Sequence, residues 1–281
     1  MSALKPQDGK LALLFLPLIA QESILPLRAG PKVAVRRYGN VSISIQGGVY
    51  DGEALPLPSG TMARRILFHA ITKAWITQDA KVQLGGIREM LRDLGIKSSS
   101  KSKRRLKAEL IRLSKMSIAI DYFPDGEDCL RSANVRLIQS LEIHGLQHDS
   151  QMSLLGSWLE FSPEFFETIR GLSHQPVMRD AIWDLTSPLS IDVYIWLQRR
   201  AQTHRKSEPL HLSWNHIYEQ FGRGEQMSKF KLAFSSAVKS ATGQMKDWGT
   251  KPAWTTTKGV YVTQAPAQVL SIESKNNSSK W

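Results

Sequence analysis

Apolar residues recur at helical spacing in three successive segments in the first half of the chain. Residues 61–78 and residues 86–94 each carry such a stripe, and Gly95 suits the end of the second segment. The stripe of the third segment, residues 97–115, consists of Leu106, Leu110 and Leu113. Serines precede this stripe and can cap the first turn of a helix by accepting a backbone N–H. The pattern predicts three helices in close succession.

Alternating apolar and polar positions predict strands on both sides of these helices. Residues 32–37 and 41–45 flank a Tyr-Gly-Asn turn and predict a hairpin in an N-terminal accessory sheet. Residues 116–123 and 133–141 alternate in the same way around a Pro-Asp-Gly turn. Two helices, a third helix and then a hairpin form the order of a winged helix-turn-helix, and we expect this second hairpin to be the wing.

The second half of the chain repeats this order without obvious sequence identity. The predicted elements are a strand at 158–161, a helical turn at 163–169, helices at 188–202, 212–221 and 226–245, and two strands within 253–263. We therefore predict an α+β fold with two winged helix-turn-helix domains in tandem and a small N-terminal β accessory region. The expected divisions are an accessory region at 1–54, winged-helix domains at 55–150 and 151–270, and a disordered polar tail at 271–281.

The apolar stretch at residues 11–20 resembles the hydrophobic region of a signal peptide. It is too short to span a bilayer, Pro17 interrupts it, and the residues that follow make a poor cleavage site. We expect a buried or dimer-facing structural segment, and a protein of the cytoplasm without membrane contact.

The charge of the chain narrows the class of partner. Its 281 residues include 37 Lys and Arg against 25 Asp and Glu, which gives a net charge of +12 and an isoelectric point of about 9.8. Such a balance favours a polyanion, either nucleic acid or an anionic membrane surface.

Enzyme chemistry has little support in the sequence. The single cysteine, Cys129, excludes an internal disulfide and a zinc site built from several thiolates. His144 and His148 lack a carboxylate pattern that would complete a metal site, and no phosphate-binding Gly-rich loop ending in Lys and Ser or Thr is found. We expect no enzyme activity, no cofactor and no metal.

The basic segment at 97–115 is the first candidate DNA-binding helix. Its positive charges lie largely off the leucine stripe, and only Glu109 carries the opposite charge. A solvated charged face is the plainer interpretation, but the one-sided sign and the position after two helices favour DNA. The candidate contacts are Ser99, Ser100, Lys101, Lys103, Arg104, Arg105 and Lys107.

The helix predicted at 226–245 is the second candidate, with an outer face of small polar residues that allows close approach to base edges. Its candidate contacts are Ser228, Lys229, Lys231, Ser235, Ser236 and Lys239, and those of the second wing are Lys251 and Lys258. We expect the first helix to bind mainly phosphates and the second to discriminate more among sequences.

Several short motifs occur in a familiar order between residues 55 and 262. They are Leu57-Pro58-Ser59-Gly60-Thr61, Arg64-Arg65-Ile66-Leu67 and Leu84-Gly85-Gly86 in the first half, then Ser187-Pro188-Leu189 with Asp192, Leu212-Ser213-Trp214 and Phe221-Gly222 in the second. In this order they resemble plasmid replication initiators of the RepA type.

The resemblance implies binding of double-stranded DNA at direct repeats (iterons) of a plasmid origin. It also implies opening of adjacent A+T-rich DNA and recruitment of host replication proteins such as the replicative helicase. A monomer–dimer equilibrium, in which the dimer represses its own gene, is implied as well. One departure is that the second candidate helix has lysines but no arginine, so the usual contact to guanine has no assigned residue.

Two alternatives use the same observations. A winged-helix transcriptional regulator would bind DNA without a role in initiation, and the sequence does not separate it from an initiator. A nicking enzyme of rolling-circle replication is disfavoured, because no His-x-His pair precedes a candidate tyrosine nucleophile.

Overall fold

The computed structural model describes residues 13–17, 25–38, 40–124, 129–144, 156–171, 174–248 and 251–266. The predicted disordered tail at 271–281, the candidate ligand His148 and most of the apolar stretch at 11–20 lie outside these ranges. Within the ranges, no helix combines the length and the apolar character that a membrane span needs.

The first unit has the topology of a winged helix. In chain order its elements are α2 (Gly60–Thr77), β6 (Lys81–Gly85), α3 (Ile87–Asp93), α4 (Ser100–Lys115), β9 (Ile138–Glu142) and β10 (Ser157–Phe161). The strands form an antiparallel sheet in the order β6-β10-β9. A short helix that follows, α5 (Pro163–Gly171), packs on α2. The three helices predicted from periodicity are confirmed.

The second unit repeats this topology element by element. Its elements are α7 (Pro188–Thr203), β12 (Leu210–Ser213), α8 (Trp214–Phe221), α9 (Met227–Thr242), the 3-10 turn η2 (Lys246–Trp248), β13 (Ala253–Thr255) and β14 (Gly259–Val262). Its sheet order is β12-β14-β13, so the first and last strands pair in both units. The fold class is α+β with two winged helices in tandem, as predicted.

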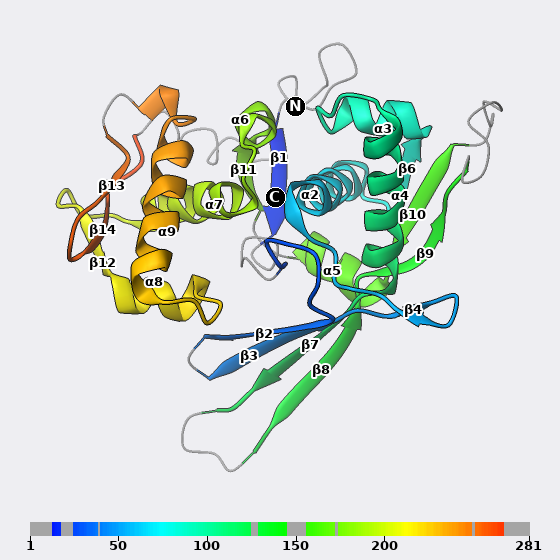
Figure 1. The fold of residues 1–281 in the computed structure, drawn as a ribbon, viewed down its shortest axis with the longest axis horizontal. Helices are drawn as coiled ribbons and strands as arrows, with labels where there is room; N and C mark the ends of the chain where they lie inside the picture. The colour runs from blue at the N-terminus through cyan, green and yellow to red at the C-terminus, as the bar shows by residue number, and fades with distance from the viewer. Residues whose placement is uncertain are drawn as a thin grey trace.

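A separate four-stranded sheet carries the accessory region. It consists of β2 (Val33–Tyr38), β3 (Val41–Gln46), β7 (Ser117–Tyr122) and β8 (Arg131–Arg136), in that order (Figure 1). The predicted N-terminal hairpin is confirmed as β2 and β3. A small hairpin, β4 (Val49–Tyr50) and β5 (Glu53–Ala54), joins this sheet to α2 in the chain.

Two predicted strand assignments are wrong, for one physical reason. The hairpin expected to be the first wing is β7 and β8, which extend the accessory sheet, and the strand expected to open the second half is β10, which completes the first winged helix. Between β8 and β9 the chain changes sheets at the buried Leu137. There Ser162 holds the crossing, since its hydroxyl donates to the Arg136 carbonyl at 2.6 Å and its N–H to the Leu137 carbonyl at 3.2 Å.

Each unit has its own hydrophobic core. The first is built by α2, α3 and α4 against their sheet, and the second by α7, α8 and α9. Aromatic rings dominate the second: Phe234 meets Trp196 and Phe221 edge-on at 5.8 and 5.1 Å between ring centroids. Phe68 of α2 packs into this second core, so the first unit is joined to it by apolar contact.

The connection between the units has a strand pair of its own. Strand β1 (Leu13–Pro17) pairs antiparallel with β11 (His174–Met178), which leads into α6 (Arg179–Asp184). Leu14 is fully buried and Leu13 is half-buried, so the expectation of a buried structural segment is confirmed at Leu14.

Arg64 of α2 and Asp192 of α7 form a buried ion pair where the two units meet. Their exposed fractions are 1% and 5%. Two parallel bonds join them, Nε to Oδ1 at 2.6 Å and Nη2 to Oδ2 at 2.7 Å. The other guanidinium donors reach the backbone carbonyls of Leu25, Pro26 and Gly60 at 2.8, 3.1 and 3.1 Å. Every N–H of this guanidinium therefore has an acceptor.

Loss of one member of this pair is expected to be costly. Asp192→Ala leaves the Arg64 charge buried without its counter-ion, which should lower the free energy of unfolding by about 3–5 kcal/mol. The matched control is Glu167→Ala in the exposed pair with Arg170, which should cost less than about 1 kcal/mol. Urea denaturation at neutral pH measures both, and equal losses in the two variants would contradict the role given to Asp192.

His69 of α2 gives the fold a pH dependence. Burial, with the nearby charges of Lys73 and Arg179, lowers the pKa of His69 to about 3 from 6.5. Because the unfolded chain binds a proton below pH 6.5 and the folded chain does not, stability should fall as the pH drops through this window. The loss due to His69 should reach about 2 kcal/mol at pH 5.

Thermal or urea denaturation from pH 7 to pH 5 tests this contribution. In His69→Gln, the free energy of unfolding should fall by about 2 kcal/mol less between pH 7 and pH 5 than in the parent protein. His216→Gln, at an exposed site of α8, should leave this pH dependence unchanged. An unchanged slope in the His69 variant would show that the acid sensitivity has another source.

Candidate nucleic-acid interface

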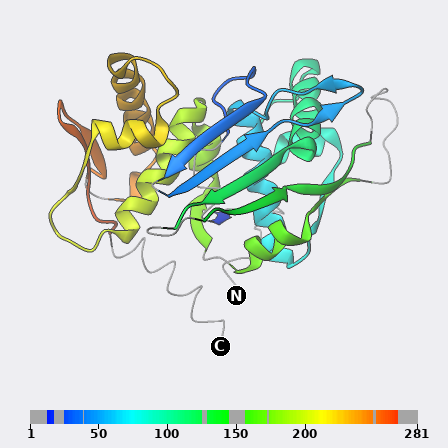
Figure 2. The ribbon, with the colours of Figure 1, turned by 90° about the horizontal axis from the view of Figure 1, so that it is seen from below.

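The third helix of each winged unit, α4 and α9, lies on the same side of the molecule. Figure 1 shows α9 in the left part and α4 in the right part of the molecule, with α7 and α2 between them, and Figure 2 shows both helices at the same edge. They run in opposite directions in Figure 1, because the chain enters α4 from α3 at the top and enters α9 from α8 at the bottom. This is the face where a winged helix presents its recognition helix.

Helix α4 is capped and docked as its sequence predicts. Ser99 is the N-cap, and its hydroxyl accepts the Ser102 N–H at 3.1 Å. The stripe residues Leu106, Leu110 and Leu113 are at most 1% exposed. The Ser99 side chain is therefore held by the helix start, while Ser100 beside it is exposed.

The one acidic residue of α4, Glu109, is buried beneath the basic side chains and lines a pocket beside this helix. Glu109 is 2% exposed and accepts the Ser59 N–H at 3.0 Å and the Arg112 guanidinium at 2.7 Å. Burial raises the pKa of this carboxyl, against the lowering effect of these partners. Glu109 ties α4 to the start of α2, and its carboxylate offsets part of the charge of Arg112 and of the nearby Arg105.

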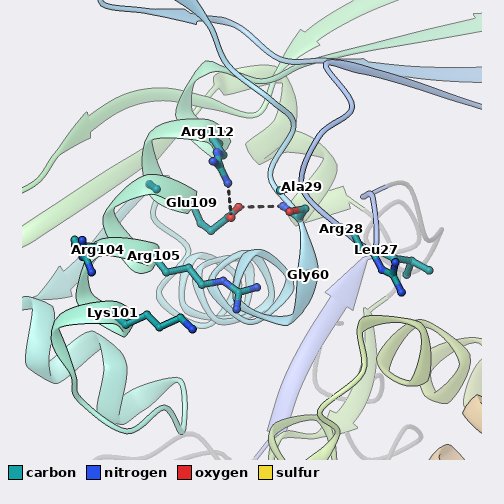
Figure 3. A pocket seen from close by; sticks show the side chains of 11 residues that line it. Leu27, Arg28, Ala29, Gly60, Lys101, Arg104, Arg105, Glu109 and Arg112 are labelled. Carbon is teal, nitrogen blue, oxygen red and sulfur yellow. Dashed lines mark hydrogen bonds and ion pairs between the residues drawn. The ribbon is translucent and has the colours of Figure 1, made fainter.

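A pocket of about 560 Å³ opens between α4, the start of α2 and residues 27–29 (Figure 3). Its cationic lining comprises Arg28, Lys101, Arg104, Arg105 and Arg112. Gly60 forms part of the wall with φ +71°, and a Cβ there would stand 2.7 Å from the Arg105 guanidinium. An opening with this lining can hold an anion of the size of a phosphate group.

The predicted contacts of α4 separate into two groups. Lys101, Arg104 and Arg105 are exposed and line the pocket together. Lys103 and Lys107 are half-buried on the flank of the helix. Arg28 belongs with the first group but was missed, because it lies in a Pro- and Gly-containing loop without periodicity.

Helix α9 presents a different surface. Phe230, Phe234 and their stripe neighbours are buried, while Ser228, Lys229, Ser236 and Lys239 are exposed and Ser235 is half-buried. Lys231 is half-buried, with its ammonium 5.8 Å from the ring centroid of Trp214. Leu232, which we did not predict as a contact, is 76% exposed. It is an apolar residue outside the buried stripe, and that position is the sequence feature that could have drawn attention to it.

The second wing is formed by β13 and β14, as predicted. Lys258 lies exposed at its tip, where its N–H bonds the Thr256 hydroxyl at 3.2 Å. Lys251 is exposed at its base, near the Trp254 ring. Residues 145–155, between β9 and β10 in the chain, lie outside the described part.

A metal centre has no support in the described ranges, where no group of three or more His, Cys, Asp and Glu side chains is arranged to hold an ion. The geometry defines a tandem winged-helix protein whose helices α4 and α9 lie on one side of the molecule, with a cationic pocket beside α4.

Comparison with known proteins places the fold. No protein-family model and no curated protein matches the sequence. Among solved structures, a crystal structure of RctB domains 2–3 aligns with 91% of this chain and with 99% of the RctB chain, with a TM-score of 0.56 and 12% sequence identity. A second structure of the same two domains covers 88% and 87%, with a TM-score of 0.54 and 13% identity. At this identity the likeness is one of fold, and it extends over both units.

The pocket gives a direct test of the interface. Arg28→Ala should weaken binding to mixed-sequence duplex DNA and reduce the slope of log affinity against log salt by about 0.9, the value for one phosphate contact. The matched control is Arg170→Ala on α5, on the opposite side of the molecule (Figure 2). Fluorescence anisotropy over a salt series measures both slopes. Indistinguishable slopes for the two variants would remove Arg28 from the interface.

Proposed function

We propose that this protein is an initiator of plasmid DNA replication that binds double-stranded DNA at repeated origin sites. The observation that carries the proposal is the placement of α4 and α9 on one face of two tandem winged helices, with the cationic pocket beside α4. The motif resemblance to plasmid initiators supports it, as does the likeness in fold to RctB domains 2–3 over both units.

The two units would bind successive major grooves on one face of the duplex. Helices on a common face suit grooves about one helical turn apart, so we expect a site of around 20 base pairs. The exposed charges of α4 would bind phosphates and fix the register. The smaller side chains of α9 would come closer to base edges.

Opening of A+T-rich DNA would follow from binding and bending of the duplex, without an enzymatic step or a cofactor. Self-association and recruitment of host replication proteins, such as the replicative helicase, complete the proposal and rest on the resemblance alone. The protein would act in the cytoplasm, where the plasmid is.

The two recognition helices should respond differently to substitution. Joint neutralisation of Lys103, Arg104 and Arg105 should weaken binding to every duplex and flatten the salt slope, because phosphate contacts are lost. Joint replacement of Ser235 and Ser236 by Ala should mainly reduce the preference for specific over random duplex. Anisotropy competition at several salt concentrations separates these effects. A changed site preference with an intact salt slope in the basic variant would reverse the two roles.

Replication itself is tested with a minimal plasmid. A plasmid that carries only this gene and its flanking direct repeats should replicate, and the protein should prefer those repeats to random duplex at moderate salt. Binding to the repeats without replication would favour a winged-helix transcriptional regulator. No preference for the repeats would exclude both.

A further inference from the structure

The outer face of α9 carries one large apolar residue, Leu232. Its side chain is 76% exposed, more than any other exposed large hydrophobic residue in the described part of the chain. The others include Val49 at 60% and Leu130 at 56%, which lie outside both recognition helices. Exposure of a leucine to this extent leaves its apolar surface in water, on a helix whose remaining outer side chains are polar or small.

The position of Leu232 on the helix is opposite to the core. The buried stripe of α9 consists of Phe230, Phe234, Ala237, Val238 and Ala241. At about 3.6 residues per turn, Leu232 stands roughly 180° from the centre of this stripe. It therefore marks the line of α9 that projects furthest from the protein, and that line would enter deepest into a groove.

The neighbours of Leu232 on this line restrict what can bind there. Ser228 and Ser236 lie about one turn before and after it, Lys239 lies two turns after it on the same line, and Lys229 lies beside the line. Hydroxyl groups and ammonium groups suit bases and phosphates, whereas an apolar protein surface would have to desolvate the lysines. Helix α4 differs, since its outer face bears Lys101, Arg104 and Lys115 at exposed positions.

We propose that Leu232 is a specificity-determining residue, which recognises thymine by packing against its C5-methyl group in the major groove. The inference rests on the proposed binding of double-stranded DNA and adds to it a particular base. The thymine methyl is the apolar group that base pairs present at the major-groove edge, and aliphatic side chains discriminate through it. It also gives α9 a means of reading sequence without an arginine.

The test removes the methyl group from the DNA and the side chain from the protein. A preferred duplex is first recovered by selection from random-sequence DNA with the full-length protein. Each thymine of that duplex is then replaced in turn by uracil, which differs only by the methyl group. At one or two thymines in the half bound by the second unit, uracil should weaken binding by about three- to sixfold, as expected for loss of a buried methyl contact.

Leu232→Ala completes the cycle. The variant should bind the thymine duplex more weakly by a similar factor and should show no further loss with uracil at those positions. Because the Leu232 side chain is exposed, the thermal unfolding midpoint of the variant should match that of the parent protein. The matched control, Leu130→Ala, should keep the full effect of uracil.

The outcomes separate this inference from the function on which it rests. Selection of a preferred duplex, followed by uracil effects that are equal in the parent and in Leu232→Ala, would overturn the thymine contact and leave DNA binding standing. A selected site without thymine in the second half, or full affinity of Leu232→Ala for the thymine duplex, would overturn it as well. Failure to select any duplex would overturn both, and Leu232 would then be a candidate for contact with a protein.

Discussion

The bidentate pair of Arg64 and Asp192 fixes how the two winged helices are placed relative to each other. It joins the first helix of one unit to the first helix of the other and holds the backbone at Leu25 and Pro26 from the same guanidinium. Arg223, which follows α8, also donates to the Leu25 carbonyl, at 3.3 Å. The loop that continues to Arg28 is thereby anchored to both units, so the pocket beside α4 depends on this junction.

If the protein binds DNA as proposed, the two recognition helices would divide the chemistry of binding. Burial of Glu109 leaves the outer face of α4 cationic, which favours phosphates and affinity. Helix α9 has the same place in its unit, but its outer line carries Ser228, Leu232, Ser236 and Lys239, and the small side chains among them would allow close approach to bases. Two copies of one topology can therefore supply affinity and discrimination separately, provided that the junction keeps them on one face.

Periodicity was sufficient to predict the three helices of each winged unit, the accessory hairpin and the second wing, because each buries one regular face, whereas the six-residue α6 was not predicted. Strands β6 and β12 alternate between exposed and more buried positions over five and four residues, but each directly precedes a helix or its cap and was not separated from it, and the alternation through 133–141 hides the change of sheet at Leu137. The Arg64–Asp192 pair spans 128 positions, and the place of Arg28 beside α4 depends on that contact. Charge and capping were sufficient to select Lys101, Arg104 and Arg105 as candidate contacts, and these residues line the pocket. Leu232 became a candidate only through its exposure in the structure.

The proposal that α4 and α9 bind DNA together from one face can be tested by a hydroxyl-radical footprint of the full-length protein on its selected duplex. Two protected segments are expected on the same face of the duplex, separated by about one helical turn of roughly 10 base pairs. A single protected segment, or two segments on opposite faces, would contradict it.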